Sequence, residues 1–469
     1  MAACNYLNKL FPFLFEAIDY YTELLLPNDL TSPHSIIADV VKGMNKEDCS
    51  NVEIIGWLYQ FYISERKDEV SGAKGKVEKE DIPAVTQLFT PRWIVEYMVQ
   101  NTLGKLWLQN YPDSNLREVM PYYIETECED DFLPINSPEE LTLVDPACGS
   151  GHILVYAFEL LTYIYEEEGY RQRDIAQLIL EKNLYGYEID ERAGQLAGLA
   201  LYLKARAYDG GFFRRECNSP HIWVYKDFEL DVEDVSQLFD ELKFKPSNEL
   251  YTDLDWMKEA TNLGSLYQPV TQKKELTELL KVIQQSKQNT LFNTVDDLSK
   301  LQFSIRQLLV LQRTYCTLVA NPPYLGGRDF NKRLKEYTGS TYADSKSDLC
   351  TCFIERGLVF IDNNCCLGMI VLPSWLFLSS FEKLRRKIVE STYISSLLHM
   401  GRGIFGVDWG STAFILNKSL KGKASGYYFR LHERTFQLIE SDIIRDLFMW
   451  TLKDKSLAVN YSKYKTEDY

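Results

Sequence analysis

The tetrapeptide Asn321-Pro322-Pro323-Tyr324 holds the residue types best suited to chemistry, directly after an apolar run at residues 318–320 that predicts a buried strand. The Asn321 side-chain carbonyl and the Pro322 backbone carbonyl can each accept a hydrogen bond from a conjugated amino group, which favours a more nucleophilic, pyramidal nitrogen. The two prolines stiffen the turn, and Tyr324 offers a ring face on which a flat base can stack. All four residues are therefore predicted to be catalytic.

A glycine-rich motif at residues 145–151 follows a second apolar run, residues 141–144. Gly149 and Gly151 let the backbone turn tightly and approach a ligand with no intervening Cβ. The helix predicted next offers free amide donors at its N-terminus, and no Gly-Lys-Ser/Thr follows, so the motif is not a Walker loop. We predict that this loop holds a nucleotide-like cofactor through Asp145, Pro146, Ala147, Cys148, Gly149 and Gly151.

Glu188 ends the next predicted strand and, with Ile189 beside it, is a second candidate for cofactor binding. A carboxylate at this strand end can accept hydrogen bonds from both ribose hydroxyls, as in dinucleotide-binding folds. The separation from Asp145 is longer than usual, and a predicted helix at residues 173–182 accounts for the excess. Asp190 is the neighbouring alternative.

The motif order resembles the gamma class of N6-adenine DNA methyltransferases, which includes type I modification subunits and fused type II restriction–modification enzymes. Phe89-Thr90-Pro91 comes first, then the glycine-rich loop, then the Asn-Pro-Pro-Tyr loop. The amino-acid sequence around the motifs is most similar to that of the methyltransferase of BREX phage-defence systems, and the resemblance covers roughly residues 50–430.

This resemblance implies S-adenosylmethionine as cofactor and N6 of adenine in double-stranded DNA as acceptor. The adenine must be flipped out of the duplex, because its amino group is out of reach inside it. Other subunits of a modification or phage-defence system are implied partners. Phe89, Thr90 and Pro91 are expected at the methionine end of the cofactor. Asp227 is expected at its adenine, although it is equally placed to cap the next helix.

Alternating strand and helix patterns predict an α/β fold with a doubly wound, mostly parallel sheet of the S-adenosylmethionine-dependent methyltransferase type. Strands are predicted at residues 141–144, 184–188, 221–225, 315–320, 366–372, 394–399 and 412–416. The expected domains are a helical N-terminal region with a linker (1–80), the cofactor-binding half of the core (81–226), an acidic helical insertion (227–300), the catalytic half (301–420), and the start of a C-terminal region (421–469) whose target-recognition part is expected to be missing.

Two local predictions concern the segment before the core. Residues 65–80 are charged, contain two glycines and lack apolar periodicity, which indicates a mobile linker or surface loop. Thr90 is expected to cap a helix that has Pro91 in its first turn.

Charge divides the chain into two unlike halves. Residues 1–300 hold 28 Lys+Arg and 51 Asp+Glu, a net −23, whereas residues 301–469 hold 23 and 16, a net +7. A polyanion would be drawn to the second half, which contains the Asn-Pro-Pro-Tyr loop. Two basic clusters there are candidates for phosphate contact or ordinary solvated helix faces: Arg328/Lys332/Arg333/Lys335 and Lys383/Arg385/Arg386/Lys387.

Several classes of protein are disfavoured by composition. No run of 18 uncharged apolar residues predicts a membrane span, and the N-terminus lacks the pattern of a secretory signal, so a cytoplasmic protein is expected. The ten cysteines show no spaced framework, so reduced thiols and no metal site are expected.

Two alternatives stay open: a protein glutamine-N5 methyltransferase, which also uses Asn-Pro-Pro-Tyr, and a non-catalytic cofactor-binding fragment or interaction module. Phe405 or Trp409 is a candidate to face a flipped base opposite Tyr324, or to be an ordinary core aromatic.

Overall fold

A computed structural model describes the chain over most of its length. The described residues are 5–6, 8–9, 27, 29–30, 32–44, 54–72, 75–125, 131–215, 218–287, 295–406, 409–419, 425–432, 438–453 and 461–465.

The core is one nine-stranded sheet in the order β3-β2-β1-β4-β5-β7-β6-β8-β9. Strands β3, β2, β1, β4 and β5 are mutually parallel, while β7 runs antiparallel to both β5 and β6. The predicted doubly wound, mostly parallel sheet is therefore confirmed. The strands are β1 (Leu143–Asp145), β2 (Leu184–Glu188), β3 (His221–Val224), β4 (Tyr315–Ala320), β5 (Ile361–Val371), β6 (Tyr393–Arg402), β7 (Gly410–Asn417), β8 (Ser425–Arg430) and β9 (Tyr461–Lys465).

The order of strands reverses direction between β1 and β4, which are parallel neighbours although more than 160 residues of chain separate them. Every residue of β4 is buried, as expected for a parallel strand covered on both faces. Ligands of open α/β sheets bind at such a switch point, at the carboxyl ends of the strands. Both predicted motifs leave the sheet at this place.

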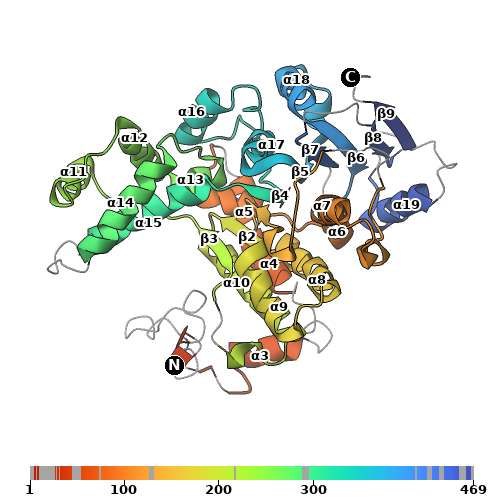
Figure 1. Ribbon diagram of the computed structural model, residues 1–469, viewed down its shortest axis with the longest axis horizontal. Helices are drawn as coiled ribbons and strands as arrows, with labels where there is room; N and C mark the ends of the chain where they lie inside the picture. Colours follow the sequence, from red (N-terminus) through yellow and green to blue (C-terminus); the bar gives the residue numbers. More distant parts are fainter. Residues whose placement is uncertain are drawn as a thin grey trace.

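Helices cover both faces of the sheet (Figure 1). A Cβ on Gly368 of β5 would meet Met98 and Thr102 on one face, whereas the neighbouring residue Met369 lies against Gly357 on the other. The first face carries α6 (Arg92–Val99), the π-helical turn η3 (Gln100–Gly104), α7 (Lys105–Asn110), α8 (His152–Glu167), α9 (Gln172–Leu178) and α10 (Glu191–Tyr208); the other carries α15 (Val295–Leu311), α17 (Leu349–Phe360) and α18 (Glu382–Ser391).

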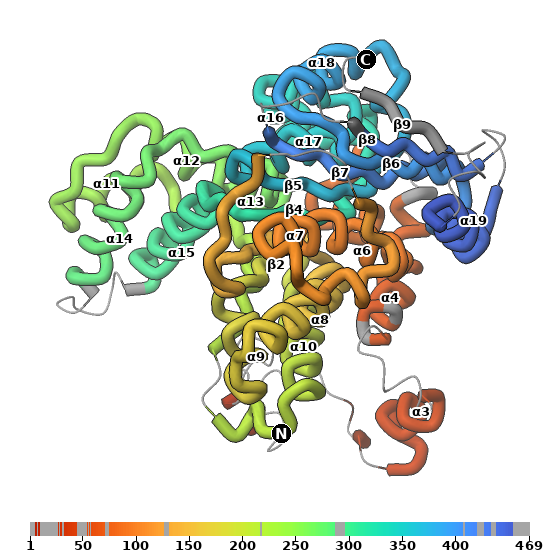
Figure 2. The backbone as a smooth tube through the Cα atoms, turned by 45° about the vertical axis from the view of Figure 1, so that its right-hand side comes forward, coloured from red at the N-terminus to blue at the C-terminus, as the bar shows by residue number. Residues whose placement is uncertain are grey.

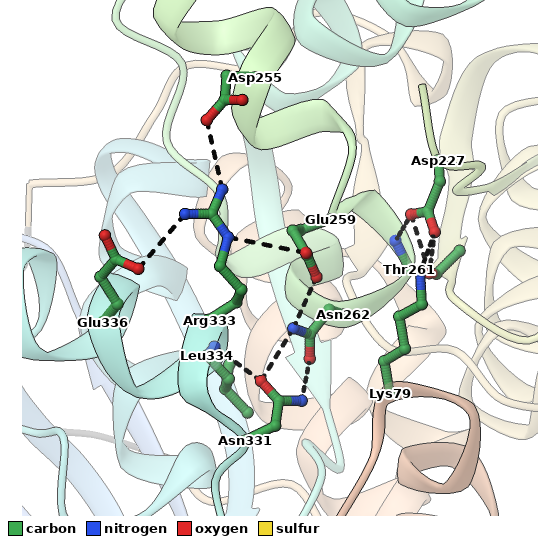
Figure 3. A network of polar contacts seen from close by, with 10 residues as sticks. All are labelled: Lys79, Asp227, Asp255, Glu259, Thr261, Asn262, Asn331, Arg333, Leu334 and Glu336. Atoms are coloured by element: carbon green, nitrogen blue, oxygen red, sulfur yellow. Dashed lines mark hydrogen bonds and ion pairs between the residues drawn. The ribbon is translucent and has the colours of Figure 1, made fainter. Parts of the chain in front are cut away.

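A group of helices between β3 and β4, here called the insertion, extends to the left in Figure 1. It comprises α11 (Val232–Glu241), α12 (Asn248–Met257), α13 (Ala260–Leu263), the 3-10 turn η8 (Gly264–Leu266), α14 (Lys273–Lys287) and the start of α15. Polar contacts join it to α16 (Lys332–Thr341) and to the N-terminal segment (Figure 3). The Asn262 and Asn331 side chains donate hydrogen bonds to each other, with distances of 3.1 and 2.9 Å.

The prediction of a linker at residues 65–80 is wrong for its first half, because α4 (Ile54–Gly72) continues through it. Glu, Lys and Arg are good helix formers, so the charged run supports a helix without needing a wide apolar face. Arg66 is tied to Glu69 of the same helix and to Asp81 of the next segment. Helix α5 (Ile82–Thr86) follows.

The remaining elements lie toward the ends of the described chain. Strand β9 and helix α19 (Ser441–Lys453) lie beside β8 on the right of Figure 1. Helix α3 (Ile36–Gly43) buries none of its residues and stands apart in Figure 2. Across the described residues, every helix is too short or too polar to cross a membrane.

Candidate active site

The two predicted motifs share one cavity at the carboxyl ends of β1 and β4. The cavity encloses about 1060 Å³ of space free of protein atoms, with the open solvent at its mouth included. Eleven of the residues predicted from the sequence line it: Phe89, Thr90, Asp145, Pro146, Ala147, Cys148, Gly149, Glu188, Ile189, Asn321 and Pro323. Pro91, Gly151, Asp227, Pro322 and Tyr324 are not among its lining residues.

The glycine-rich loop needs both of its glycines for different reasons. Gly149 has φ +52° and a Cβ there would meet no atom within 4 Å, so this part of the loop presents bare backbone to open space. Gly151 has φ +84°, and a Cβ would lie 3.0 Å from the backbone of Ala197. Gly151 therefore allows the turn into α8 to pack on α10, although it does not line the cavity.

Two buried carboxyl groups flank this loop. The side chain of Glu188 accepts hydrogen bonds from the backbone N–H groups of Gly149 (2.7 Å), Ile189 (2.8 Å) and Asp190 (3.0 Å). Burial raises the pKa of Glu188 to about 7 despite these donors. Burial likewise raises the pKa of Asp145 to about 8, although its carboxylate accepts a hydrogen bond from the Ala147 N–H.

The Asn321 side chain is held in one orientation by the segment that contains Phe89-Thr90-Pro91. Its Nδ2 donates to the backbone carbonyl of Leu88 (3.1 Å) and to the Thr90 hydroxyl (2.9 Å). A flipped amide would set its oxygen against the Leu88 carbonyl, which is repulsive. Oδ1 of Asn321 is buried and has no hydrogen-bond partner among the described residues. The amide thus presents an unused acceptor within the lining of the cavity.

The prediction that Thr90 caps a helix is wrong. The N-cap of α6 is Pro91, which makes no side-chain cap hydrogen bond, and the Thr90 hydroxyl accepts from Asn321, 231 residues away in sequence. The ring of Phe89 lies 4.2 Å from that of His152, the first residue of α8.

Tyr324 lies beyond the cavity lining in an aromatic group. Its hydroxyl donates to the backbone carbonyl of Ile370 in β5 (2.9 Å), which fixes the ring. The rings of Phe405 and Trp409 lie 5.9 and 6.3 Å from it. Both aromatic candidates from the loop before β7 therefore lie beside Tyr324.

Two walls of the cavity were not predicted from the sequence. Helix α4 supplies Gly56, Tyr59 and Gln60. The Tyr59 hydroxyl donates to the side chain of Asp190, next to the Glu188 strand end. A Cβ on Gly56 would press on the Ser150 side chain, so α4 approaches the glycine-rich loop closely.

The insertion forms the second unpredicted wall, through residues 262–266. The Ser265 hydroxyl donates to the backbone carbonyl of Pro146 (2.6 Å), which joins the insertion to the glycine-rich loop. Gly264 has φ +50°, and a Cβ there would lie 2.7 Å from Ile189. Gly264 is the C-cap of α13, and a glycine is a sequence signal for the end of a helix, but nothing local identifies the surface on which it packs.

Asp227 is occupied elsewhere. Its carboxylate forms an ion pair with Lys79 (2.7 Å) and accepts from the backbone N–H and the hydroxyl of Thr261 (Figure 3). It joins the N-terminal segment to the insertion, and the structure does not bring it to the cavity. It does not cap α11 either, whose N-cap is Asp231.

One predicted phosphate contact is already neutralised. Arg333 lies within ion-pair distance of Asp255 (3.3 Å), Glu336 (3.3 Å) and Glu259 (3.7 Å), as Figure 3 shows, and its guanidinium stacks 4.1 Å from the ring of Trp256. It connects α16 to the insertion.

In the described part of the chain, no group of three or more His, Cys, Asp or Glu side chains is arranged to hold a metal ion.

Two family models together match residues 136–405, which supply most of the cavity lining but not its part between Gly56 and Thr90. The model described as Eco57I restriction-modification methylase matches residues 182–405, and the model described as the MmeI DNA-methyltransferase domain matches residues 136–227. The resemblance to DNA methyltransferases of the restriction–modification type is thereby confirmed.

Two curated relatives are similar over nearly the whole chain. This chain is 38% identical over 468 residues to the adenine-specific methyltransferase BrxX of Escherichia coli O9:H4 (strain HS). The alignment covers 92% of this chain and 38% of that protein. It is 35% identical over 457 residues to the adenine-specific methyltransferase PglX of Lacticaseibacillus casei (strain Zhang), covering 91% and 37%. The chain thus spans less than two fifths of the length of either relative.

Solved structures give more distant likenesses. The ATP-dependent type ISP restriction-modification enzyme LlaBIII bound to DNA aligns with a TM-score of 0.49 and 14% identity, over 99% of this chain and 28% of that one. A modification subunit of a type I restriction enzyme from Vibrio vulnificus YJ016 aligns with a TM-score of 0.42 and 15% identity, over 89% and 61%.

Proposed function

Taking the methylase domains matched at residues 136–405 as the premise, we propose that this chain transfers a methyl group from S-adenosylmethionine to N6 of adenine in double-stranded DNA. The observation that carries the proposal is the Asn321 amide, whose two N–H groups are both engaged while its buried Oδ1 is unused. An unpaired buried acceptor is costly, so it marks a place where a donor from a ligand belongs.

The lining residues fit such a cofactor. Bare backbone at Gly149 leaves open space beside the loop, and three backbone N–H groups occupy only part of the acceptor capacity of the Glu188 carboxylate. A ribose hydroxyl can take the remainder. When bound, S-adenosylmethionine supplies an activated methyl group on a positively charged sulfur.

The catalytic loop acts on the acceptor by orientation and hydrogen bonding. Oδ1 of Asn321 and the backbone carbonyl of Pro322 accept the two hydrogens of the adenine amino group. They favour the geometry in which the nitrogen lone pair leaves conjugation with the ring and becomes available as a nucleophile. Tyr324, fixed by its bond to Ile370, offers a stacking surface for the flipped base.

Methyl transfer itself tests the proposal. The purified chain is titrated with S-adenosylmethionine and then assayed for radiolabelled methyl incorporation into bacterial DNA that lacks adenine methylation, and into release factor. We expect DNA to be labelled and Asn321→Ala to abolish labelling with a nearly unchanged dissociation constant for the cofactor. Labelling of release factor alone would favour the glutamine-N5 activity. Cofactor binding without labelling of either would indicate a binding module.

A further inference from the structure

Two adjacent apolar side chains stand in solvent just beyond the end of β5. Phe377 is 64% exposed and Leu378 is 45% exposed. They follow the 3-10 turn η9 (Pro373–Leu376), whose Trp375 is buried against Phe414 with ring centroids 5.1 Å apart. Single apolar residues are common on protein surfaces, but a pair on an anchored turn is a feature to be explained.

The turn is braced from α18. Nη1 of Arg385 donates to the backbone carbonyls of Trp375 and Leu378, each at 2.8 Å. Trp375 below and Arg385 beside it thus hold the turn in one conformation. A contact made by Phe377 and Leu378, here called the apolar tip, requires little further ordering of the backbone.

The apolar tip leaves the sheet at the same edge as the catalytic loop, because β5 runs parallel to β4 with Met369 opposite Ala320. A Cβ on Gly410 would lie 2.8 Å from Pro373, and Gly410 follows Trp409, the neighbour of Tyr324. The tip begins four residues after Pro373, a reach of at most about 14 Å of chain. The tip therefore begins within about 14 Å of Pro373, which packs beside the loop that carries Trp409.

The surface next to the apolar tip suits a polyanion. Ser379 and Ser380 are exposed, and so are the side chains of Lys383 and Arg386 on α18. Arg386 pairs with Glu382 at 3.5 Å, and both side chains are more than 60% exposed, so this ion pair is weak. Residues 301–469, the part of the sequence that contains the tip, carry a net charge of +7 from 23 basic and 16 acidic residues.

We propose that the apolar tip inserts into the base stack of duplex DNA beside the flipped adenine, while Ser379, Ser380, Lys383 and Arg386 contact the flanking phosphates. This inference rests on the proposed function. Flipping removes one base from the stack, and proteins that distort duplex DNA insert Phe or Leu side chains between base steps to stabilise the distorted form. The rigid, exposed tip at the catalytic edge supplies these side chains.

The proposal predicts a defect that depends on the form of the DNA. Phe377→Ala combined with Leu378→Ala should lower kcat/KM at least tenfold on duplex bacterial DNA that lacks adenine methylation. The same DNA, heat-denatured, should be methylated within about twofold of the wild-type rate, because single strands need no flipping. Phe377→Leu should keep most of the activity on duplex DNA. Tyr163→Ala, which removes a 49% exposed aromatic ring from α8, is the matched control and should affect neither form.

Each result decides between the two proposals. Full activity of the double variant on duplex DNA, or an equal loss on both forms, would overturn the role of the tip while leaving the methyltransferase activity in place. Absence of labelling of either form by the wild-type chain would instead refute the proposed function. Thermal melting of all variants shows whether a loss reflects unfolding, which the exposure of both side chains makes unexpected.

Discussion

Replacing Thr90 by Val should separate methyl transfer from cofactor binding. The substitution keeps the shape of the side chain but removes the hydroxyl that accepts from Asn321 Nδ2 at 2.9 Å. One buried N–H group is then left without a partner, while the bond to the Leu88 carbonyl remains. Leaving a buried donor unsatisfied costs about 1–3 kcal/mol, which corresponds to a loss of roughly 5- to 150-fold in the population of the productive amide orientation.

That loss should appear in the chemical step. Single-turnover methyl transfer at saturating DNA should slow by about this factor in Thr90→Val, whereas the dissociation constant of S-adenosylmethionine, measured by titration calorimetry, should change less than threefold. Thr90→Ser keeps an acceptor at the same place and is the control, so it should recover most of the rate.

Two results would refute the reasoning. A wild-type rate in Thr90→Val would mean that Leu88 alone orients Asn321. A main effect on cofactor affinity in Thr90→Ser that is absent from Thr90→Val would instead mean that the methyl group of Thr90 matters through the shape of the cavity.

Three further predictions address the cofactor and the insertion. Burial raises the pKa of Glu188 to about 7, and a ribose hydroxyl donates best to the ionised carboxylate. The dissociation constant of S-adenosylmethionine should therefore fall as pH rises from about 6 to about 8, and Glu188→Gln should flatten this profile in titration calorimetry. Because the pKa is raised in the folded state, the same group makes the free protein lose stability as pH rises between about 4.5 and about 7, which thermal melting of the wild type and the Gln variant can compare. Gly264→Val should weaken cofactor binding at least tenfold in the same titration, because its φ of +50° and its approach to Ile189 leave no room for a side chain; unchanged affinity would exclude the insertion as a wall of the cavity. Arg333→Ala should leave the affinity for duplex DNA unchanged in an anisotropy titration but lower the melting temperature, since its partners are acidic residues of the insertion and of α16; a weakened DNA complex would restore it as a phosphate contact.

Local sequence was sufficient to place the Asn-Pro-Pro-Tyr loop and the glycine-rich loop at the ends of strands, where both contribute to one cavity. The strands predicted at 184–188 and 315–320 match β2 and β4 residue for residue. The apolar run before Asn321 ends in Asn-Pro-Pro, which indicates a buried strand followed by a sharp turn, and both signals depend only on neighbours in sequence. The alternation of strands and helices also predicted a mostly parallel sheet. Parallel strands bring their carboxyl ends to one edge, so the two loops were expected there together.

Only the tertiary structure decided which distant residues complete the site. Helix α4 contributes Tyr59, residues 262–266 contribute a wall, and Thr90 serves Asn321 instead of a helix terminus. Asp227 had the expected position after β3, yet its carboxylate is engaged by Lys79. Such partners are selected by how whole elements pack in space. The local sequence pattern indicates that a face or a side chain will be buried, because burial favours apolar and capping residues. It does not indicate which part of the chain covers that face or side chain.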